Sequence, residues 1–261
     1  MRIGISLLTW NYFEYTERCL ESLVRTLKHP SELVILDNGS SDGTPLKITS
    51  MQLATRCKPL MSAKFIFEKE NQGLIKGRNL TLGPLLMSPS VEYILLIHND
   101  HILTEGMIEG LLEVFEAEPK AGIVGTEIFQ SKDVPVIEDL EKWAKEKRQK
   151  KWHRGNCHPC LMKVSALKEI LMPDGKLYDE SFGAQDNEDI DALGRLEDAG
   201  YKTLVTETAW AWHRGELSRS LRPDAQQEKY RSRSIYERKW HNMRKVPWDH
   251  RKDVNYERTP A

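Results

Sequence analysis

The chain has 261 residues, of which 39% are hydrophobic and 30% are charged, and its formal net charge is −1 at pH 7. These values suit one α/β domain with a sizeable core and a C-terminal extension. The near-zero charge excludes a nucleic-acid-binding protein defined by bulk positive charge. No apolar run approaches the roughly 20 residues that cross a bilayer. Four cysteines without disulfide-framework spacing predict a cytoplasmic protein.

Short apolar runs alternate with stretches of helical periodicity along the first half of the chain. The pattern predicts strands at 3–8, 33–36, 65–67, 93–97 and 122–125, and helices at 12–27, after 44, from 74 to about 87, and at 105–116. Strands that alternate with helices and are apolar on both faces predict a mostly parallel sheet with helices on both sides.

Polar residues follow two of these predicted strands. Asp37 begins the turn-rich segment DNGSSDGT (37–44), and YILLIHND (93–100) ends in a cluster of polar side chains. In parallel α/β sheets, ligands bind beyond the carboxyl ends of the strands. We therefore expect Asp37 and Asp100 to face the same crevice.

Two segments of the second half carry excess positive charge. Residues 142–154 hold seven Lys/Arg against one Glu, and residues 214–258 hold thirteen Lys/Arg against seven Asp/Glu. The first segment is predicted as a solvated helix or loop, with a lid for an anionic acceptor as the alternative. The second is predicted as a helical tail that wraps the first domain.

The motifs, taken in order, resemble the family 2 glycosyltransferases, which have the GT-A fold. They are SLLTWN (6–11), LVILDNGSSDGT (33–44), NQGLIKGRN (71–79), LLIHND (95–100), YDESFGAQDNEDIDALGRLEDAGYK (178–202), WAWHRG (210–215) and, with less weight, YERKW (236–240). The resemblance implies a catalytic domain over 1–215, with a nucleotide-sugar-binding half (1–126) and an acceptor-binding half (127–215). A basic helical extension would follow over 216–261.

On the donor side, the resemblance places a nucleoside against Asp37, with Thr9 and Asn11 lining the base pocket. The alternative for Asp37 is a simple turn residue, because Asp-Asn-Gly forms turns on its own. Gly73 precedes a predicted helix and allows close backbone approach. Arg78, within two turns of that helix start, is expected to meet a diphosphate, with an exposed helical arginine as the alternative.

The metal site is expected at His98-Asn99-Asp100, where the family has Asp-x-Asp or Asn-x-Asp. Asp100 keeps the principal ligand position, whereas His98 departs from the pattern and puts the donor geometry in doubt. His213 matches a family histidine that contacts the metal or the diphosphate. Oxygen ligands suit Mg²⁺ or Mn²⁺, and an imidazole favours Mn²⁺. The alternative is a polar strand end without a metal.

The acidic pair Glu188-Asp189 opens a predicted helix and matches the family's catalytic pair. The resemblance implies that Asp189 is the general base that takes the proton of the acceptor hydroxyl. The alternative is an acidic first turn without a catalytic role. Asp191 and Arg195, four residues apart, are predicted to form an ion pair.

Cys157-His158-Pro159-Cys160 has the CxxC spacing of some zinc and redox sites. A structural zinc site needs a second ligand pair, and none follows at finger-like spacing. The segment is therefore predicted to belong to a strand beneath the acceptor and to hold no zinc.

The resemblance, with these residues, implies an inverting, metal-assisted hexosyltransferase that uses a nucleoside-diphosphate sugar. UDP is the first expectation for the donor, with GDP and dTDP as alternatives. The acceptor is not specified, although the basic segments favour an anionic glycan or other polymer. A non-catalytic nucleotide-sugar-binding relative is the alternative function. A sugar nucleotidyltransferase is disfavoured, because TWNYFEY (9–15) replaces the Gly-rich basic loop that such enzymes need.

Overall fold

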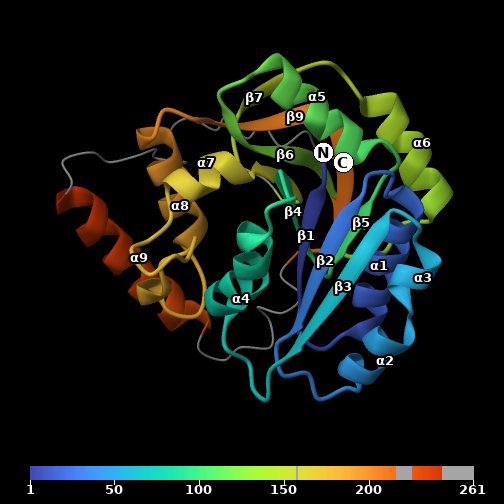
Figure 1. Ribbon diagram of the computed structural model, residues 1–261, viewed down its shortest axis with the longest axis horizontal. Helices are drawn as coiled ribbons and strands as arrows, with labels where there is room; N and C mark the ends of the chain where they lie inside the picture. The colour runs from blue at the N-terminus through green and yellow to red at the C-terminus, as the bar shows by residue number, and fades with distance from the viewer. Residues whose placement is uncertain (157, 216–224, 243–261) are drawn as a thin grey trace.

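The computed structural model of the protein describes residues 1–156, 158–215 and 225–242 (Figure 1). The strands are β1 (Ile3–Thr9), β2 (Ser31–Asp37), β3 (Leu60–Phe67), β4 (Tyr93–His98), β5 (His101–Leu103), β6 (Ala121–Gln130), β7 (Trp152–Arg154), β8 (Cys160–Lys163) and β9 (Lys202–His213). The helices are α1 (Phe13–Thr26), α2 (Thr44–Ser50), α3 (Leu53–Arg56), α4 (Leu74–Met87), α5 (Met107–Ala117), α6 (Ile137–Lys147), α7 (Val164–Glu169), α8 (Glu188–Asp198) and α9 (Ala225–Asn242), with a 3-10 helix η1 (Glu180–Phe182).

All the described strands join one sheet. Its order is β3-β2-β1-β4-β8-β6-β9-β5, and β7 pairs with β9 outside this path. Strands β3, β2, β1 and β4 run parallel to one another, whereas β8 lies antiparallel to both β4 and β6. β6 and β9 are parallel, and β5 and β7 pair antiparallel with β9. The sheet is therefore parallel in its first half and mixed in its second half.

Helices cover both faces of this sheet, and each face has its own apolar core. On one face Ile5 of β1 packs in a buried cluster with Leu20 of α1 and Leu111 of α5. On the other face Leu96 of β4 belongs to a cluster with residues of α4, α7 and α8. Figure 1 shows α1, α2 and α3 on one side of the first strands and α4 on the other. Burial on both faces explains why these strands are nearly continuous apolar runs.

The α/β fold with helices on both faces is confirmed, and each predicted element of the first half is present. The strand predicted at 202–206 continues to His213 as β9. The predicted division of the domain at 126–127 lies within β6. Of the predicted C-terminal extension, α9 is described, and residues 216–224 and 243–261 lie outside the described residues. Among the described helices, none has the length and hydropathy needed to span a membrane.

Helix α9 lies beside α8 and η1 (Figure 1). Its aromatic side chains anchor it there, because Trp240 is 1% exposed and Tyr236 packs against the cluster that contains Phe182. The Trp240 indole Nε1 donates a hydrogen bond of 3.1 Å to Asp191 Oδ1 on α8. The described part of the extension is thus packed against the segment that carries Glu188 and Asp189.

Candidate active site

The carboxyl ends of β1, β2 and β4 lie side by side at one edge of the sheet. Thr9 is in register with Asp37, and Leu8 is in register with His98. Asn99, just after β4, donates from Nδ2 to Thr9 Oγ1 at 3.3 Å. The parallel order of these strands therefore brings Asp37 and the His98–Asp100 segment to the same edge, as the sequence predicted.

Asp37 is 1% exposed at the end of β2. Its Oδ1 accepts a hydrogen bond of 2.9 Å from the backbone N–H of Ser40, which closes the predicted turn. Its Oδ2 is buried without a hydrogen-bond partner among the described residues. Asn11, at φ 56, accepts from the Ser41 backbone N–H at 2.9 Å. Asp37 thus serves the turn with one oxygen and leaves the other available as an acceptor.

Gly73 lies where two segments approach closely at the start of α4. Its φ of +85° is a conformation that side chains rarely adopt, and an added Cβ would lie 2.8 Å from Ala184 Cα. The Leu74 N–H donates to the Ala184 carbonyl oxygen at 2.6 Å. The glycine therefore allows the loop before α8 to lie against the N-terminus of α4.

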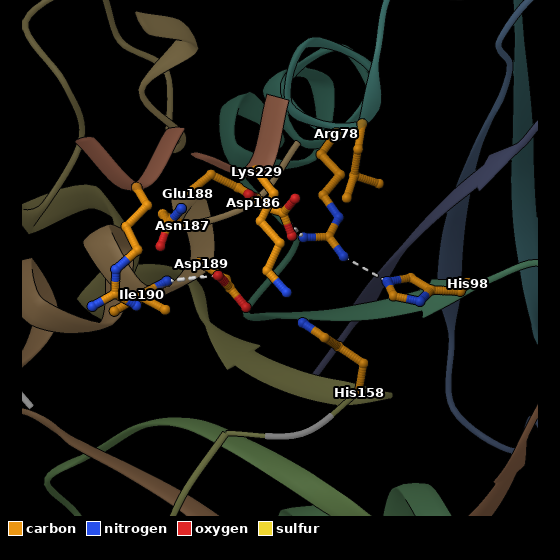
Figure 2. A pocket seen from close by; sticks show the side chains of 11 residues that line it. Arg78, His98, His158, Asp186, Asn187, Glu188, Asp189, Ile190 and Lys229 are labelled. Atoms are coloured by element: carbon orange, nitrogen blue, oxygen red, sulfur yellow. Dashed lines mark hydrogen bonds and ion pairs between the residues drawn. The ribbon is translucent and has the colours of Figure 1, made fainter. Parts of the chain in front are cut away.

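Arg78 on α4 is buried and bridges two elements of the site (Figure 2). Its Nη1 lies 3.1 Å from Glu188 Oε1, and its Nη2 lies 2.5 Å from His98 Nε2. Burial and, to a smaller extent, the neighbouring Asp189 raise the pKa of Glu188 to about 7, although Arg78 acts to lower it. Arg78 is therefore not the exposed helical arginine considered as an alternative.

Four histidine rings gather between β4, β5, β9 and the segment before β8. The ring centroid of His98 lies 4.9 Å from that of His101 and 5.1 Å from that of His158. The ring centroids of His101 and His213 are 4.4 Å apart. Burial lowers the pKa of His98, His101 and His158 well below its usual value, so these rings are neutral at pH 7. The sequence did not single out His101 or His158.

Side-chain atoms of His98, Asp100, His101 and His213 lie within 4.8 Å of one another and could hold a metal ion. A neutral imidazole has one lone pair. The lone pair of His98 accepts a hydrogen bond from Arg78 Nη2. The lone pair of His101 accepts a hydrogen bond of 3.0 Å from the His98 backbone N–H. Asp100 and His213 are therefore the two residues of this group best suited to bind a metal ion, and their Oδ1 and Nε2 atoms are 3.4 Å apart.

A cavity of about 400 Å³ opens beside this cluster (Figure 2). Its walls include Arg78, His98, His158, Asp189 and Lys229. Asp189 accepts from the Ile190 backbone N–H at 2.8 Å through Oδ1 and from Asn156 Nδ2 at 3.3 Å through Oδ2. Asp100 is 6% exposed and does not line this cavity. Of the predicted metal segment, His98 therefore shares the cavity with Asp189, whereas Asp100 does not.

Residues 5–171 match the model of the family described as glycosyl transferase family 2. The chain belongs to this family. The resemblance drawn from the motifs is therefore confirmed, and a search of curated proteins found no match to this family 2 member.

Solved structures share the fold of this family 2 member. TarS from S. aureus (residues 1–349) is 14% identical with a TM-score of 0.58, and the match covers 83% of this chain and 61% of that one. The structure of GalNAc-T7 with UDP, GalNAc and Mn²⁺ is 11% identical with a TM-score of 0.64, covering 84% of this chain and 44% of that one. The chain therefore spans about three fifths or less of these solved chains.

Proposed function

We propose that the protein is an inverting glycosyltransferase that moves a sugar from a nucleoside-diphosphate sugar to an acceptor hydroxyl. One observation carries the proposal: the cavity beside His98 is also lined by Asp189. Such a transfer needs positive charge near the leaving diphosphate and a base near the attacking hydroxyl. Arg78 lines this cavity as a cation and Asp189 lines it as a carboxylate, so one cavity brings together a group of each kind.

The donor is proposed to lie along the ends of β2, β1 and β4. The unpartnered Oδ2 of Asp37 is suited to accept a hydrogen bond from a base N–H or a ribose hydroxyl, with Thr9 and Asn11 beside it. UDP is the first choice of nucleotide, since TarS and GalNAc-T7 have both been solved with UDP. GDP and dTDP remain alternatives for the test.

Asp100 and His213 are proposed to hold a divalent cation, with diphosphate oxygens completing its coordination. When bound, the ion would neutralise the charge that develops on the leaving diphosphate. A carboxylate with an imidazole favours Mn²⁺ over Mg²⁺. His98, which stands where relatives have an acid, is engaged with Arg78, so it is proposed to shape the cavity wall.

Asp189 is proposed to act as the general base. It takes the proton of the acceptor hydroxyl as the oxygen attacks C1 of the sugar, and the bond from C1 to the diphosphate breaks on the opposite side, which inverts the anomeric centre. Asp189 lies in the first turn of α8 and lines the cavity. Glu188 is paired with Arg78, so its proposed role is to position α8.

A donor screen that measures release of the nucleoside diphosphate tests this proposal. We expect turnover of a UDP-sugar with Mn²⁺, and we expect Asp189→Asn to lower turnover at least tenfold with UDP affinity unchanged, since base assistance is worth about 10²–10⁴ in rate. Asp198→Asn, at the exposed end of the same helix, is the control. Equal loss of turnover and UDP affinity would remove Asp189 from the base role. Metal-independent UDP binding without turnover would support a non-catalytic relative.

Three earlier predictions go beyond this chemistry and stay predictions. They are the division of the catalytic domain near 126–127, the cytoplasmic location, and the direct contact of Arg78 with the diphosphate. Since Arg78 already bonds to His98 and Glu188, a diphosphate would share this guanidinium with them.

A further inference from the structure

Helix α9 is fastened to the turn that precedes the proposed base. Asp186 and Asn187 have φ values of 72° and 64°, and α8 begins at the next residue. Ser232 of α9 is 0% exposed against this turn. Its hydroxyl donates to the Asp186 carbonyl oxygen and accepts from Asn187 Nδ2, the latter at 2.9 Å. One serine of the C-terminal helix thus binds both residues of the turn.

The C-terminal half of α9 is held by charge as well. Lys239 Nζ lies 2.7 Å from Asp179 Oδ2 and 2.8 Å from Asp191 Oδ1. Asp191 is 0% exposed and also accepts from Trp240 Nε1. These contacts, with those of Ser232, fix the rotation of α9 about its axis.

That rotation turns Lys229 and Arg233 toward the cavity. Both line it together with Asp189, and they are four residues apart on one side of α9. Figure 2 shows the Lys229 side chain extending into the cavity beside Asp189. The basic tail noted in the sequence therefore supplies part of the wall around the proposed base.

The other charged groups nearby already have partners. Arg78 is paired with Glu188, and the Arg233 Nε lies 2.7 Å from Glu237 Oε1. Within the described part of the chain, no acidic side chain lies within ion-pair distance of Lys229. Among the described residues its ammonium group thus extends into the cavity without forming an ion pair.

We propose that α9 forms an acceptor subsite in which Lys229, flanked by Arg233, binds an anionic group of the acceptor, a phosphate or a carboxylate. The inference rests on the proposed function, because it takes Asp189 as the base that meets the acceptor hydroxyl. Thr9, Asn11 and Asp37, proposed to bind the nucleoside, do not line this cavity. The place of Lys229 beside Asp189 therefore assigns it to the acceptor.

Binding of small alcohols and sugars by calorimetry or ligand-observed NMR tests the subsite. The probes are glycerol 3-phosphate and glucuronate, which are anionic, and glycerol and glucose, which are neutral. Each is titrated with UDP and Mg²⁺ at saturation, so that the donor half is filled. We expect the parent protein to bind at least one anionic probe and to bind it more tightly than its neutral counterpart. Phosphate and carboxylate are distinguished by which anionic probe binds.

Variants of α9 supply the matched comparison. Lys229→Gln is expected to lower the affinity for the anionic probe about fivefold, since an exposed charge pair contributes modestly to binding. The double variant, Lys229→Gln with Arg233→Gln, is expected to lower this affinity further. Lys229→Arg should retain binding, and Arg238→Gln, an exposed cation on the same helix, should match the parent. All variants should keep the parent affinity for UDP.

Three results would overturn the subsite: equal binding of anionic and neutral probes, no binding of either, or unchanged binding in the double variant. A loss of UDP affinity in Lys229→Gln would also overturn it, because Lys229 would then contact the donor. Failure of the proposed function has a different signature. In that case the parent protein would neither bind UDP nor turn over a nucleotide sugar.

Discussion

Arg78 and Glu188 form an ion pair, Nη1 to Oε1 at 3.1 Å, in which both side chains are 3% exposed. The pair joins α4 to the first residue of α8. Ser232 of α9 holds the turn just before that residue from another side. The proposed base, Asp189, thus follows a point at which three helices are bound together.

Arg78→Met is expected to destabilise the protein by about 3 kcal/mol at pH 8, because it leaves Glu188 buried without its counter-charge. The pKa of Glu188 in the folded protein, about 7, lies above its ordinary value of 4.5. The folded state therefore binds the proton more tightly, and this contribution to stability is lost as pH rises from about 4.5 to about 7. Without Arg78 the pKa rises further, so the loss extends above pH 7. The cost of Arg78→Met should be larger at pH 8 than at pH 5.

Urea unfolding at the two pH values measures this difference. Lys76→Met, an exposed position on the same helix, is the control and should cost less than about 0.5 kcal/mol at either pH. A cost of Arg78→Met that is the same at pH 5 and pH 8 would mean that Arg78 does not stabilise the ionised form of Glu188.

Gly73→Ala should destabilise the protein by about 2 kcal/mol, since the added methyl group meets the Ala184 backbone at a φ of +85°. Gly83→Ala on the same helix is the matched control. Outside its own helix and its chain neighbours, nothing lies within 4 Å of a Cβ there. Because Pro84 follows and restricts the residue before it, alanine should change the stability by less than about 1 kcal/mol. Thermal unfolding of both variants gives the comparison. Similar effects at the two positions would contradict the close approach of the loop at 184.

Ser232→Ala should lower donor turnover about tenfold while UDP affinity stays the same. The substitution leaves the Asn187 amide and the Asp186 carbonyl without their partner at the turn that places Asp189. Ser234→Ala, on the exposed side of α9, should behave as the parent protein. The measurement is the maximal rate of nucleoside diphosphate release beside UDP titrations. If Ser232→Ala changes stability but not the maximal rate, α9 has no positioning role.

Local sequence patterns were sufficient for the elements and for much of the site. A continuous apolar run, such as residues 93–97 of β4, reflects burial on both faces of the sheet, and it can be recognised from the sequence of that strand alone. The turn at Asp37 and the acidic start of α8 are local signals as well. The predicted ion pair of Asp191 and Arg195 is confirmed at 3.0 Å.

The histidine cluster was missed because it depends on the order of strands in space. β8 enters the sheet antiparallel between β4 and β6, and this places His158 beside His98. The CHPC sequence suggested a role for its cysteines, and nothing in it indicates that His158 lies beside His98. His101 adjoined the predicted metal segment, yet only its pairing with His213 across β5 and β9 shows that it faces the same group.

The role of α9 could not be predicted from its composition. Its charge pattern is that of a solvated helix, whereas Ser232 and Trp240 are buried and Lys239 is paired with two aspartates. Such contacts depend on how α9 packs against segments that lie 45 to 60 residues earlier in the chain. Positive charge predicted an interaction with an anion, and we propose that it occurs where Lys229 and Arg233 line the cavity.

The most direct test of the central claim is calorimetric titration of UDP into the parent protein and Asp100→Asn, each with and without Mn²⁺. We expect Mn²⁺ to strengthen UDP binding at least tenfold in the parent and to have little effect in Asp100→Asn, whereas the affinities without metal should agree. The same response to Mn²⁺ in both proteins would contradict a metal held by Asp100 at the diphosphate.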